Sequence, residues 1–306
     1  MIHISEILSH YGLAERAPVT LIRESGDNVV YSIGNRSKAI LRISKHLSPD
    51  EIGFENDALI HLERAHVHVP KIIPTIDGQR CVVVDGMPAV LFEFISGRHL
   101  TIDKDHHPTQ EEAHNAGMEL GALAAAGVSF VSDHPRTRSI ATELERAMRD
   151  RDVFMDTFEG GRRFISEVEE ALASFRSYTG PTGLIHNDFR PSNVLFGEQS
   201  DVVAILDMDW SCVGPLIKDL ALAALEWSCP DRADVPDMSL LHAFVDGYDL
   251  RAPHKIEPTG ELFTWIRYSA LSDSCTYLCD LIGDPVAEKR ITRSYMYRKF
   301  LYFSKL

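Results

Sequence analysis

Residues Leu184–Ala221 read LIHNDFRPSNVLFGEQSDVVAILDMDWSCVGPLIKDLA, a stretch in which two short apolar runs flank a polar turn that contains a glycine. The runs are Val194–Phe196 and Val202–Leu206, and this pattern predicts a β-hairpin with a longer loop. Asn193 comes directly before the first run, and Asp207 comes directly after the second. Because antiparallel strands fold back on each other, we expect both polar side chains at the open end of the hairpin.

A third oxygen-bearing side chain, that of Asp188, lies on the loop that leads into the same end of the hairpin. Mg²⁺ takes one or two protein oxygens and keeps its other positions for phosphate and water, so Asn193 and Asp207 form a suitable seat for it. Asp188 is then placed to act as a catalytic base or to orient an attacking hydroxyl. These are the groups that phosphoryl transfer uses. The alternative is an ordinary buried hairpin whose polar ends are incidental.

The segment HNDFRPSN, residues 186–193, resembles the catalytic loop of protein-kinase-like enzymes, and LDMD, residues 206–209, resembles their Asp-Phe-Gly segment. Gly214-Pro215 and Asp219-Leu220-Ala221 resemble the GP…DLA run of the aminoglycoside phosphotransferase family, which also includes choline kinases and type II homoserine kinases. The resemblance implies an α+β, two-lobed protein-kinase-like fold that uses ATP and Mg²⁺. It places a nucleotide-binding lobe, a small antiparallel sheet with one helix, in residues 1–95. A larger, mainly helical lobe for catalysis and substrate binding takes residues 96–306.

The sequence before this stretch predicts an antiparallel meander. Three β-type stretches, Val19–Arg23, Asn28–Ile33 and Ala39–Ile43, are separated by turn residues. In the third, apolar residues alternate between the two faces, and Arg42 is a cation embedded in the strand.

A helix is predicted to begin at Ser48, where Ser-Pro-Asp-Glu matches an N-terminal capping box. Its apolar stripe includes one carboxylate, Glu55, which needs a partner on a buried face. Arg42 on the neighbouring sheet is the candidate partner. The resemblance implies that this pair holds nucleotide phosphates, whereas the simpler reading is a structural salt bridge.

The segment Leu91–Gly97 resembles the hinge between the two lobes of such kinases. The resemblance implies that backbone groups at about Glu93 and Ile95 bind adenine; the alternative is an edge strand that ends at a glycine turn. Ser25 and Gly26 lie in a short turn where protein kinases carry a glycine-rich loop over the phosphates. A hairpin turn without ligand contact is the other interpretation.

Four further residues of the central stretch receive roles. Arg190 either stabilises charge on the transferred phosphoryl group or caps the loop from the surface. Asp209 is either an auxiliary metal ligand or a contact to the substrate. His186 and Asp219 are expected to brace the catalytic loop by hydrogen bonds.

Composition narrows the function. The net charge of −14 argues against a nucleic-acid-binding protein, which would carry a basic surface. The five cysteines are odd in number and scattered, which favours reduced thiols over a disulfide framework. Reduced thiols in turn favour a cytoplasmic location. We find no signal peptide and no apolar run long enough to span a bilayer, so no membrane partner is expected. A monomer or homodimer is anticipated.

The leading hypothesis is an ATP- and Mg²⁺-dependent kinase that phosphorylates a hydroxyl of a small polar metabolite or antibiotic. A protein kinase is disfavoured, because the sequence lacks an Ala-Pro-Glu segment and leaves little room for an activation loop after Asp207. A catalytically weak nucleotide-binding regulator is the alternative from another class, although the expected catalytic residues are all present.

The acceptor stays open at this point. Local likenesses favour type II homoserine kinases, at Tyr11-Gly12-Leu13, at the NVLF of residues 193–196 and at Glu226-Trp227-Ser228. Three late carboxylates, Asp273, Asp280 and Asp284, are candidates to line a pocket for an amine-rich aminoglycoside, but a solvated acidic helix face is the default reading.

Overall fold

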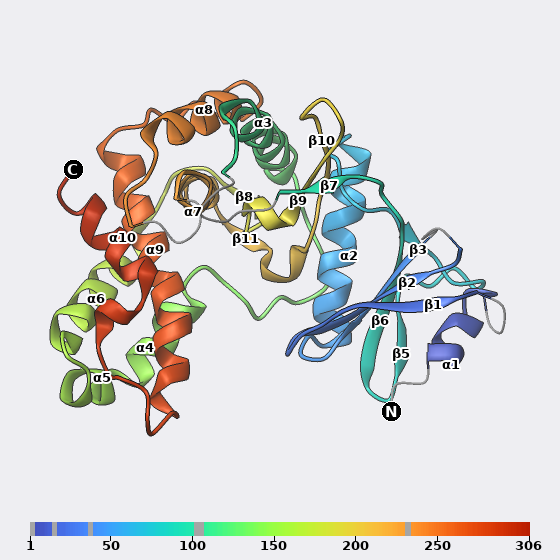
Figure 1. Cartoon of the computed structure of the whole chain (residues 1–306), viewed down its shortest axis with the longest axis horizontal. Helices are drawn as coiled ribbons and strands as arrows, with labels where there is room; N and C mark the ends of the chain where they lie inside the picture. Colours follow the sequence, from blue (N-terminus) through green and yellow to red (C-terminus); the bar gives the residue numbers. More distant parts are fainter. Residues whose placement is uncertain (1–3, 14–16, 36–38, 101–106, 230–233) are drawn as a thin grey trace.

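Two lobes of different secondary structure make up the chain (Figure 1). An antiparallel sheet forms the smaller lobe and a mainly helical body forms the larger one, as the fold prediction requires, but the smaller lobe has two helices where one was expected. The computed structural model describes residues 4–13, 17–35, 39–100, 107–229 and 234–306. Within these ranges no helix is long and apolar enough to cross a membrane. The division at residue 95 stays a prediction.

The sheet of the smaller lobe is antiparallel throughout, in the order β1-β2-β3-β6-β4, with β5 also paired to β6. The strands of this sheet are β1 (Val19–Glu24), β2 (Asn28–Ile33), β3 (Ala39–Ser44), β4 (Ile72–Ile73), β5 (Val82–Val84) and β6 (Met87–Glu93). The predicted meander forms β1, β2 and β3. The central position of β3 holds Arg42 between β2 and β6, so its side chain projects from the middle of the sheet.

Two helices cover the sheet on different sides. Helix α1 (Ile4–Ser9) buries Ile7 and Leu8 in an apolar cluster that also contains Leu41 and Ile43 of β3. Helix α2 (Pro49–Arg64) lies between the sheet and the larger lobe. The predicted capping box is present: the Ser48 side chain accepts from the Glu51 amide, and the Glu51 carboxylate accepts from the Ser48 amide. The cap fixes where α2 begins and therefore which of its residues face the sheet.

Helices dominate the larger lobe. They are α3 (Gln110–Gly127), α4 (Thr142–Arg149), α5 (Arg151–Thr157), α6 (Gly161–Ser177), α7 (Leu216–Ser228), α8 (Met238–Asp249), α9 (Gly260–Ile282) and α10 (Tyr295–Phe303). The capping box at Thr109 heads α3 as its sequence indicates. Helix α4 begins at Thr142, after a turn in which the Thr142 amide donates to the Ser139 carbonyl. Helix α10 docks on the rest of this lobe, with Phe300 and Phe303 buried.

The predicted hairpin is confirmed at the centre of the molecule. Strands β9 (Val194–Phe196) and β10 (Val202–Ile205) pair antiparallel, and β7 (Arg98–His99) adds to β9. A second pair, β8 (Thr182–Ile185) with β11 (Cys212–Pro215), was not predicted. Strand β8 leads into the catalytic loop, and β11 follows the segment that begins at Asp207. The two-strand pair therefore fixes both segments at one place.

Candidate active site

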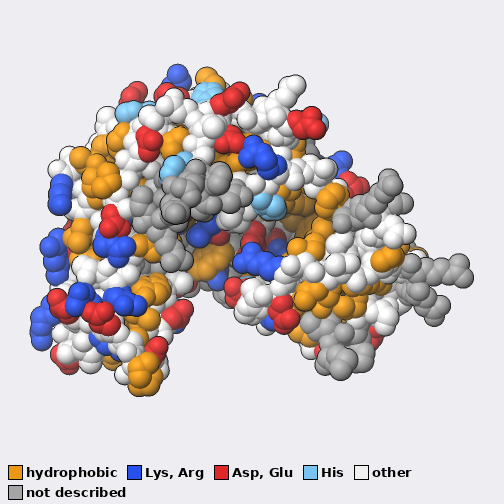
Figure 2. Space-filling view, viewed as in Figure 1, with side chains coloured by type: hydrophobic (Ala, Val, Ile, Leu, Met, Phe, Trp, Pro, Cys, Tyr) orange, Lys and Arg blue, Asp and Glu red, His pale blue; other side chains and the backbone are white. Residues whose placement is uncertain are grey.

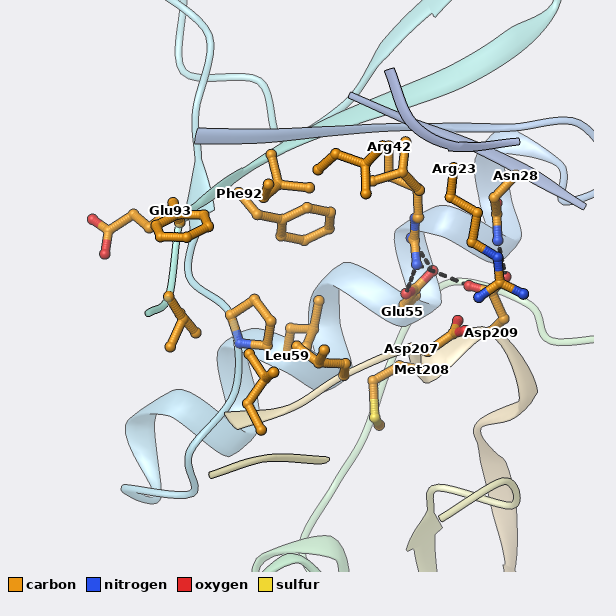
Figure 3. Close-up of a pocket in the computed structure, with 18 of the residues that line it drawn as sticks. Arg23, Asn28, Arg42, Glu55, Leu59, Phe92, Glu93, Asp207, Met208 and Asp209 are labelled. Carbon is orange, nitrogen blue, oxygen red and sulfur yellow. Dashed lines mark hydrogen bonds and ion pairs between the residues drawn. The ribbon is translucent and has the colours of Figure 1, made fainter. Parts of the chain in front are cut away.

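A cleft of about 440 Å³ lies between the two lobes. Figure 2 shows the hollow, in which Lys or Arg and Asp or Glu side chains gather. The walls of the cleft are unlike at its two ends (Figure 3): Phe92 and Leu59 form an apolar end, and Arg42, Glu55 and Asp209 form a charged one. A planar apolar group and a polyanion would each find a suitable wall in one cavity.

Arg42 and Glu55 form the ion pair that the sequence predicts. The guanidinium makes two parallel contacts, from Nη2 to Glu55 Oε2 at 2.6 Å and from Nη1 to Glu55 Oε1 at 2.7 Å. Glu55 is 1% exposed and Arg42 is 9% exposed. Burial lowers the pKa of Arg42, but Glu55 and Asp209 outweigh it, so the pKa is raised above its ordinary value. The result is a permanent buried cation at the charged end of the cleft.

Asp209 joins this pair from the other lobe. Its Oδ1 accepts from Arg42 Nη1 at 2.8 Å, and its Oδ2 accepts from Asn28 Nδ2 at 2.6 Å. Despite burial, the nearby Arg42 holds the pKa of Asp209 below its usual value. The sequence offered metal binding or substrate contact for Asp209. The bond to Arg42 is a third contact that the sequence did not predict.

The two expected metal ligands meet at the mouth of the hairpin. The Leu206 amide donates to the Asn193 carbonyl at 2.8 Å, which places Asp207 beside Asn193. Asn193 Nδ2 donates to Asp188, and Asn193 Oδ1 accepts a long 3.5 Å hydrogen bond from Ser192 Oγ, which leaves its second lone pair for a ligand. Burial and, to a smaller extent, the negative charge of Asp209 raise the pKa of Asp207 to about 7. Such a crowded carboxylate fits a cation, since a nearby positive charge favours its ionised form.

This donor set suits Mg²⁺, which keeps several waters and needs few protein ligands. Among the described residues there is no group of three or more His, Cys, Asp or Glu able to hold a metal ion. An ion at Asn193 and Asp207 would therefore depend on bound phosphate and water for its other ligands.

Asp188 is held from two sides. Asn193 Nδ2 donates to its Oδ2 at 3.0 Å, and Arg190 Nε donates to its Oδ1 at 2.7 Å. Burial raises the pKa of Asp188, and Arg190 counteracts this effect. Arg190 lines a second cavity and not the interlobe cleft. Its guanidinium contacts the Asp188 carboxylate and does not face the charged end of the cleft.

His186 and Asp219 brace the loop as expected. Asp219 accepts the backbone amides of His186 and Asn187, at 2.8 and 2.7 Å. His186 Nδ1 accepts the Asp188 amide at 3.2 Å, so Nε2 carries the proton that is donated to the Leu206 carbonyl at 2.9 Å. Asn187 adopts a left-handed backbone with φ of 64°. The hydrogen bonds fix Asp188 relative to the hairpin mouth.

The predicted hinge lines the apolar end of the cleft at Glu93 and Ile95. The Glu93 amide donates to the Lys71 carbonyl at 2.9 Å, and its side chain points away from the cavity (Figure 3). A contact from Glu93 to adenine would therefore use its carbonyl. In the short turn, Ser25 lines the cleft and its hydroxyl accepts the Asn28 amide at 3.1 Å, whereas Gly26 is not part of the wall.

The second cavity, of about 270 Å³, lies on the helical side of Asp188. The catalytic loop, α7 and α9 form its walls, and Trp210 lines both this cavity and the interlobe cleft. Its polar lining residues are Ser139, Glu143, Asn187, Asp188, Arg190, Lys218, Ser269, Ser272, Asp273 and Thr276. We name it the acceptor cavity. The default reading of Asp273 as a solvated carboxylate was wrong, because Asp273 faces this cavity.

Comparison with known proteins agrees with this geometry. Residues 18–258 match the model of the phosphotransferase enzyme family. The chain belongs to that family. Phosphotransferase family relatives include the homoserine kinase of Mesorhizobium japonicum, 27% identical over 283 residues that cover 90% of this chain and 82% of the relative. The homoserine kinase of Neisseria meningitidis is 26% identical over 267 residues, which cover 85% and 84%.

Solved phosphotransferases share the fold. A microcompartment-associated aminopropanol kinase superposes with a TM-score of 0.72 at 20% identity, covering 99% of this chain and 96% of that one. An amicoumacin kinase in complex with AMP-PNP, Ca²⁺ and Ami gives a TM-score of 0.76 at 14% identity, with coverage of 99% and 92%. These likenesses show the fold. The family match, together with the homoserine kinase relatives, indicates an ATP-using kinase of small molecules with a hydroxyl acceptor. The protein-kinase and regulator alternatives are not favoured.

The phosphotransferase site contains residues that sequence reasoning missed. Arg136 donates from Nε to the Ser211 carbonyl at 2.8 Å and from Nη2 to the Asp209 carbonyl, and so holds the segment after Asp207. Asn28 and Lys218 were also overlooked. Arg136 lies in an irregular connection with no periodicity, so only the tertiary contact reveals it. Asn28 had a weak signal, since it ends the turn that contains Ser25.

Proposed function

We propose that this phosphotransferase transfers the γ-phosphate of ATP to the hydroxyl of a small amine-bearing acceptor, with homoserine as the first candidate. The curated relatives named above are homoserine kinases. The structural neighbours act, by their names, on aminopropanol and amicoumacin. A cavity of about 270 Å³ favours a small acceptor over a large antibiotic.

One observation supports the proposal most strongly: Asp188 stands between the two cavities. Its carboxylate lines the acceptor cavity and also accepts a hydrogen bond from Asn193, the neighbour of Asp207 at the charged end of the cleft. A hydroxyl that binds to Asp188 from the acceptor side would face the phosphate side. Alignment of this kind supplies much of the rate enhancement in phosphoryl transfer.

The residues of the cleft receive the following roles. Phe92 and Leu59 would pack on adenine, and the Glu93 carbonyl and the Ile95 backbone would bind its edge. Arg42, oriented by Glu55, would contact the phosphates, with Ser25 and Gly26 near them. Asn193 and Asp207 would hold Mg²⁺, which neutralises phosphate charge when it is bound. Arg190 would orient Asp188, and we assign Asp209 to the contact with Arg42.

A coupled assay of ADP release tests the proposal. The acceptors are L-homoserine, choline, methylthioribose and an aminoglycoside, each with and without EDTA. We expect metal-dependent turnover with L-homoserine above the acceptor-free rate. Turnover with none of them, or turnover that survives EDTA, would contradict the proposal. The expectations of a cytoplasmic location and of a monomer or homodimer stay predictions.

A further inference from the structure

Lys218 is a buried cation that the mechanism above does not use. It stands in the first turn of α7, is 4% exposed, and lines the acceptor cavity. Its Nζ donates a hydrogen bond to Asn187 Oδ1 on the catalytic loop. Within the described residues this amide oxygen is its only hydrogen-bond partner, which compensates the ammonium poorly, because a buried charge is normally paired with an opposite charge.

The carboxylates around Lys218 are committed elsewhere. Asp219, its neighbour in the chain, accepts the amides of His186 and Asn187 with its two oxygens. Asp188 accepts from Arg190 and Asn193. Burial lowers the pKa of Lys218, and these carboxylates, together with Asp273, only counteract that effect from a distance. The ammonium therefore lacks an anionic partner of its own within the described parts of the chain.

Asp273 is the complementary case on the facing helix α9. It lines the same cavity, and within the described residues its carboxylate makes no hydrogen bond or ion pair. Burial and, to a smaller extent, the negative charge of Glu226 raise the pKa of Asp273 to about 6. Glu226 stands two turns after Lys218 on α7, about 12 Å along the helix axis. Its Oε1 is buried and has no hydrogen-bond partner. Beside the paired Asp188 and Arg190, the acceptor cavity thus has a cationic pole at Lys218 and an acidic pole at Asp273.

We propose that Lys218 binds a carboxylate of the acceptor and Asp273 binds its ammonium, so that the cavity selects a hydroxyl-bearing zwitterion over an amino alcohol without a carboxylate. This inference rests on the proposed function, and it adds the residues that choose among small amine-bearing acceptors. The two poles fix the orientation of the zwitterion, and Asp188 faces the same cavity to receive its hydroxyl.

The test compares two acceptors that differ at one group, L-homoserine and its alcohol analogue 2-amino-1,4-butanediol. The wild-type enzyme should show a kcat/KM at least about tenfold higher for L-homoserine, because a charged contact is lost with the analogue. In Lys218→Met, which keeps the length of the side chain, the ratio of the two kcat/KM values should fall at least about tenfold. In Asp273→Asn both acceptors should lose kcat/KM, since both carry the amine.

Asn187→Gly is the matched control. It removes the amide partner of Lys218, and glycine accepts the left-handed backbone at this position. If Lys218 only positioned Asn187, Lys218→Met and Asn187→Gly would each lower kcat/KM for L-homoserine and for the diol by the same factor. That result would overturn the proposal. A wild-type enzyme that uses the diol as well as L-homoserine would also overturn it. Thermal melting of each variant separates loss of folding from loss of selectivity.

Calorimetric titration keeps this inference distinct from the proposed function. L-Homoserine and the diol are titrated into wild-type protein and Lys218→Met without nucleotide. If no acceptor is phosphorylated but L-homoserine binds at least about tenfold more tightly than the diol, and Lys218→Met abolishes the difference, then the inference stands and the proposed reaction fails. Equal affinities for the two compounds in the wild-type protein would sink the inference alone.

Discussion

Arg42 Nη1 donates a 2.8 Å hydrogen bond to Asp209 Oδ1, across 167 positions of sequence and across the cleft between the two lobes. The same guanidinium holds Glu55 of α2. One strand residue thereby joins the sheet, helix α2 and the segment after β10. The charged end of the cleft is a single network, and a change at one member alters the surroundings of the others.

The first prediction separates Asp207 from Asp209. Both oxygens of Asp209 are engaged by Arg42 and Asn28, so Asp209→Asn should lower the melting temperature but leave the half-saturating Mg²⁺ concentration unchanged. Asp207→Asn should raise that concentration or abolish turnover, because it removes a metal ligand. Rates measured across a Mg²⁺ series decide the matter. A shifted Mg²⁺ dependence in Asp209→Asn would show that Asp209 is an auxiliary metal ligand.

The second prediction concerns Asp188. Asp188→Ala should lower kcat about 10³-fold while ATP affinity is largely retained, since Asp188 acts on the hydroxyl and not on the nucleotide. Asp201→Ala, which removes an exposed carboxylate at the far end of the same hairpin, is the control. Full activity in Asp188→Ala would remove this residue from the mechanism.

The third prediction concerns the buried ion pair. Arg42→Met leaves Glu55 and Asp209 buried without their cation, which should cost about 3–5 kcal/mol of unfolding free energy. The double variant Arg42→Met with Glu55→Met should recover part of that loss, because it removes one of the two unpaired carboxylates and leaves Asp209. Neither variant should bind ATP with wild-type affinity. Urea unfolding and nucleotide titration provide the two measurements. Wild-type ATP affinity in the double variant would leave Arg42 with a structural role only.

The fourth prediction is a pH dependence of stability at Asp273. Its folded pKa of about 6 lies above its ordinary value, so the folded state binds the proton more tightly than the unfolded chain does. The carboxylate therefore costs stability increasingly as pH rises from about 4 to 6, and the cost is constant above. Asp273→Asn should match the wild type near pH 4 and exceed it by at most about 3 kcal/mol at pH 7.5.

Denaturant titrations at the two pH values check this prediction. Asp280→Asn on the same helix is the control, since the Asp280 side chain is 67% exposed and pairs with Arg146. An equal stability difference between Asp273→Asn and the wild type at both pH values would mean that Asp273 is not strained by burial.

Local sequence predicted the hairpin well, because strand pattern and turn chemistry act over a few residues. The mouth formed by Asn193 and Asp207 followed from strand pairing alone. The Arg42–Glu55 pair was also accessible, since a lone carboxylate on an apolar helix stripe requires a cation nearby. In these cases the physical demand is visible in one short window of sequence.

Contacts between distant segments were not accessible in this way. Arg136 sits in an irregular connection, and its bonds to the carbonyls of Asp209 and Ser211 depend on where that connection crosses the molecule. Lys218 follows a short apolar run at the start of α7, and nothing in that run indicates that α9 packs against it. Strands β8 and β11 are separated in the sequence by the catalytic loop and the β9–β10 hairpin, so no local pattern indicates that they pair. Tertiary packing decides all three.

Trp210 lines both the interlobe cleft and the acceptor cavity, and Asn187 Nδ2 donates to its carbonyl at 3.1 Å. The other two tryptophans, Trp227 and Trp265, are 0% and 5% exposed in the helical core. Quenching of indole emission by small solutes should therefore arise mainly from Trp210. Trp210 is therefore an intrinsic fluorescent probe between the interlobe cleft and the acceptor cavity. Its emission allows the order of substrate binding to be followed without chemical turnover.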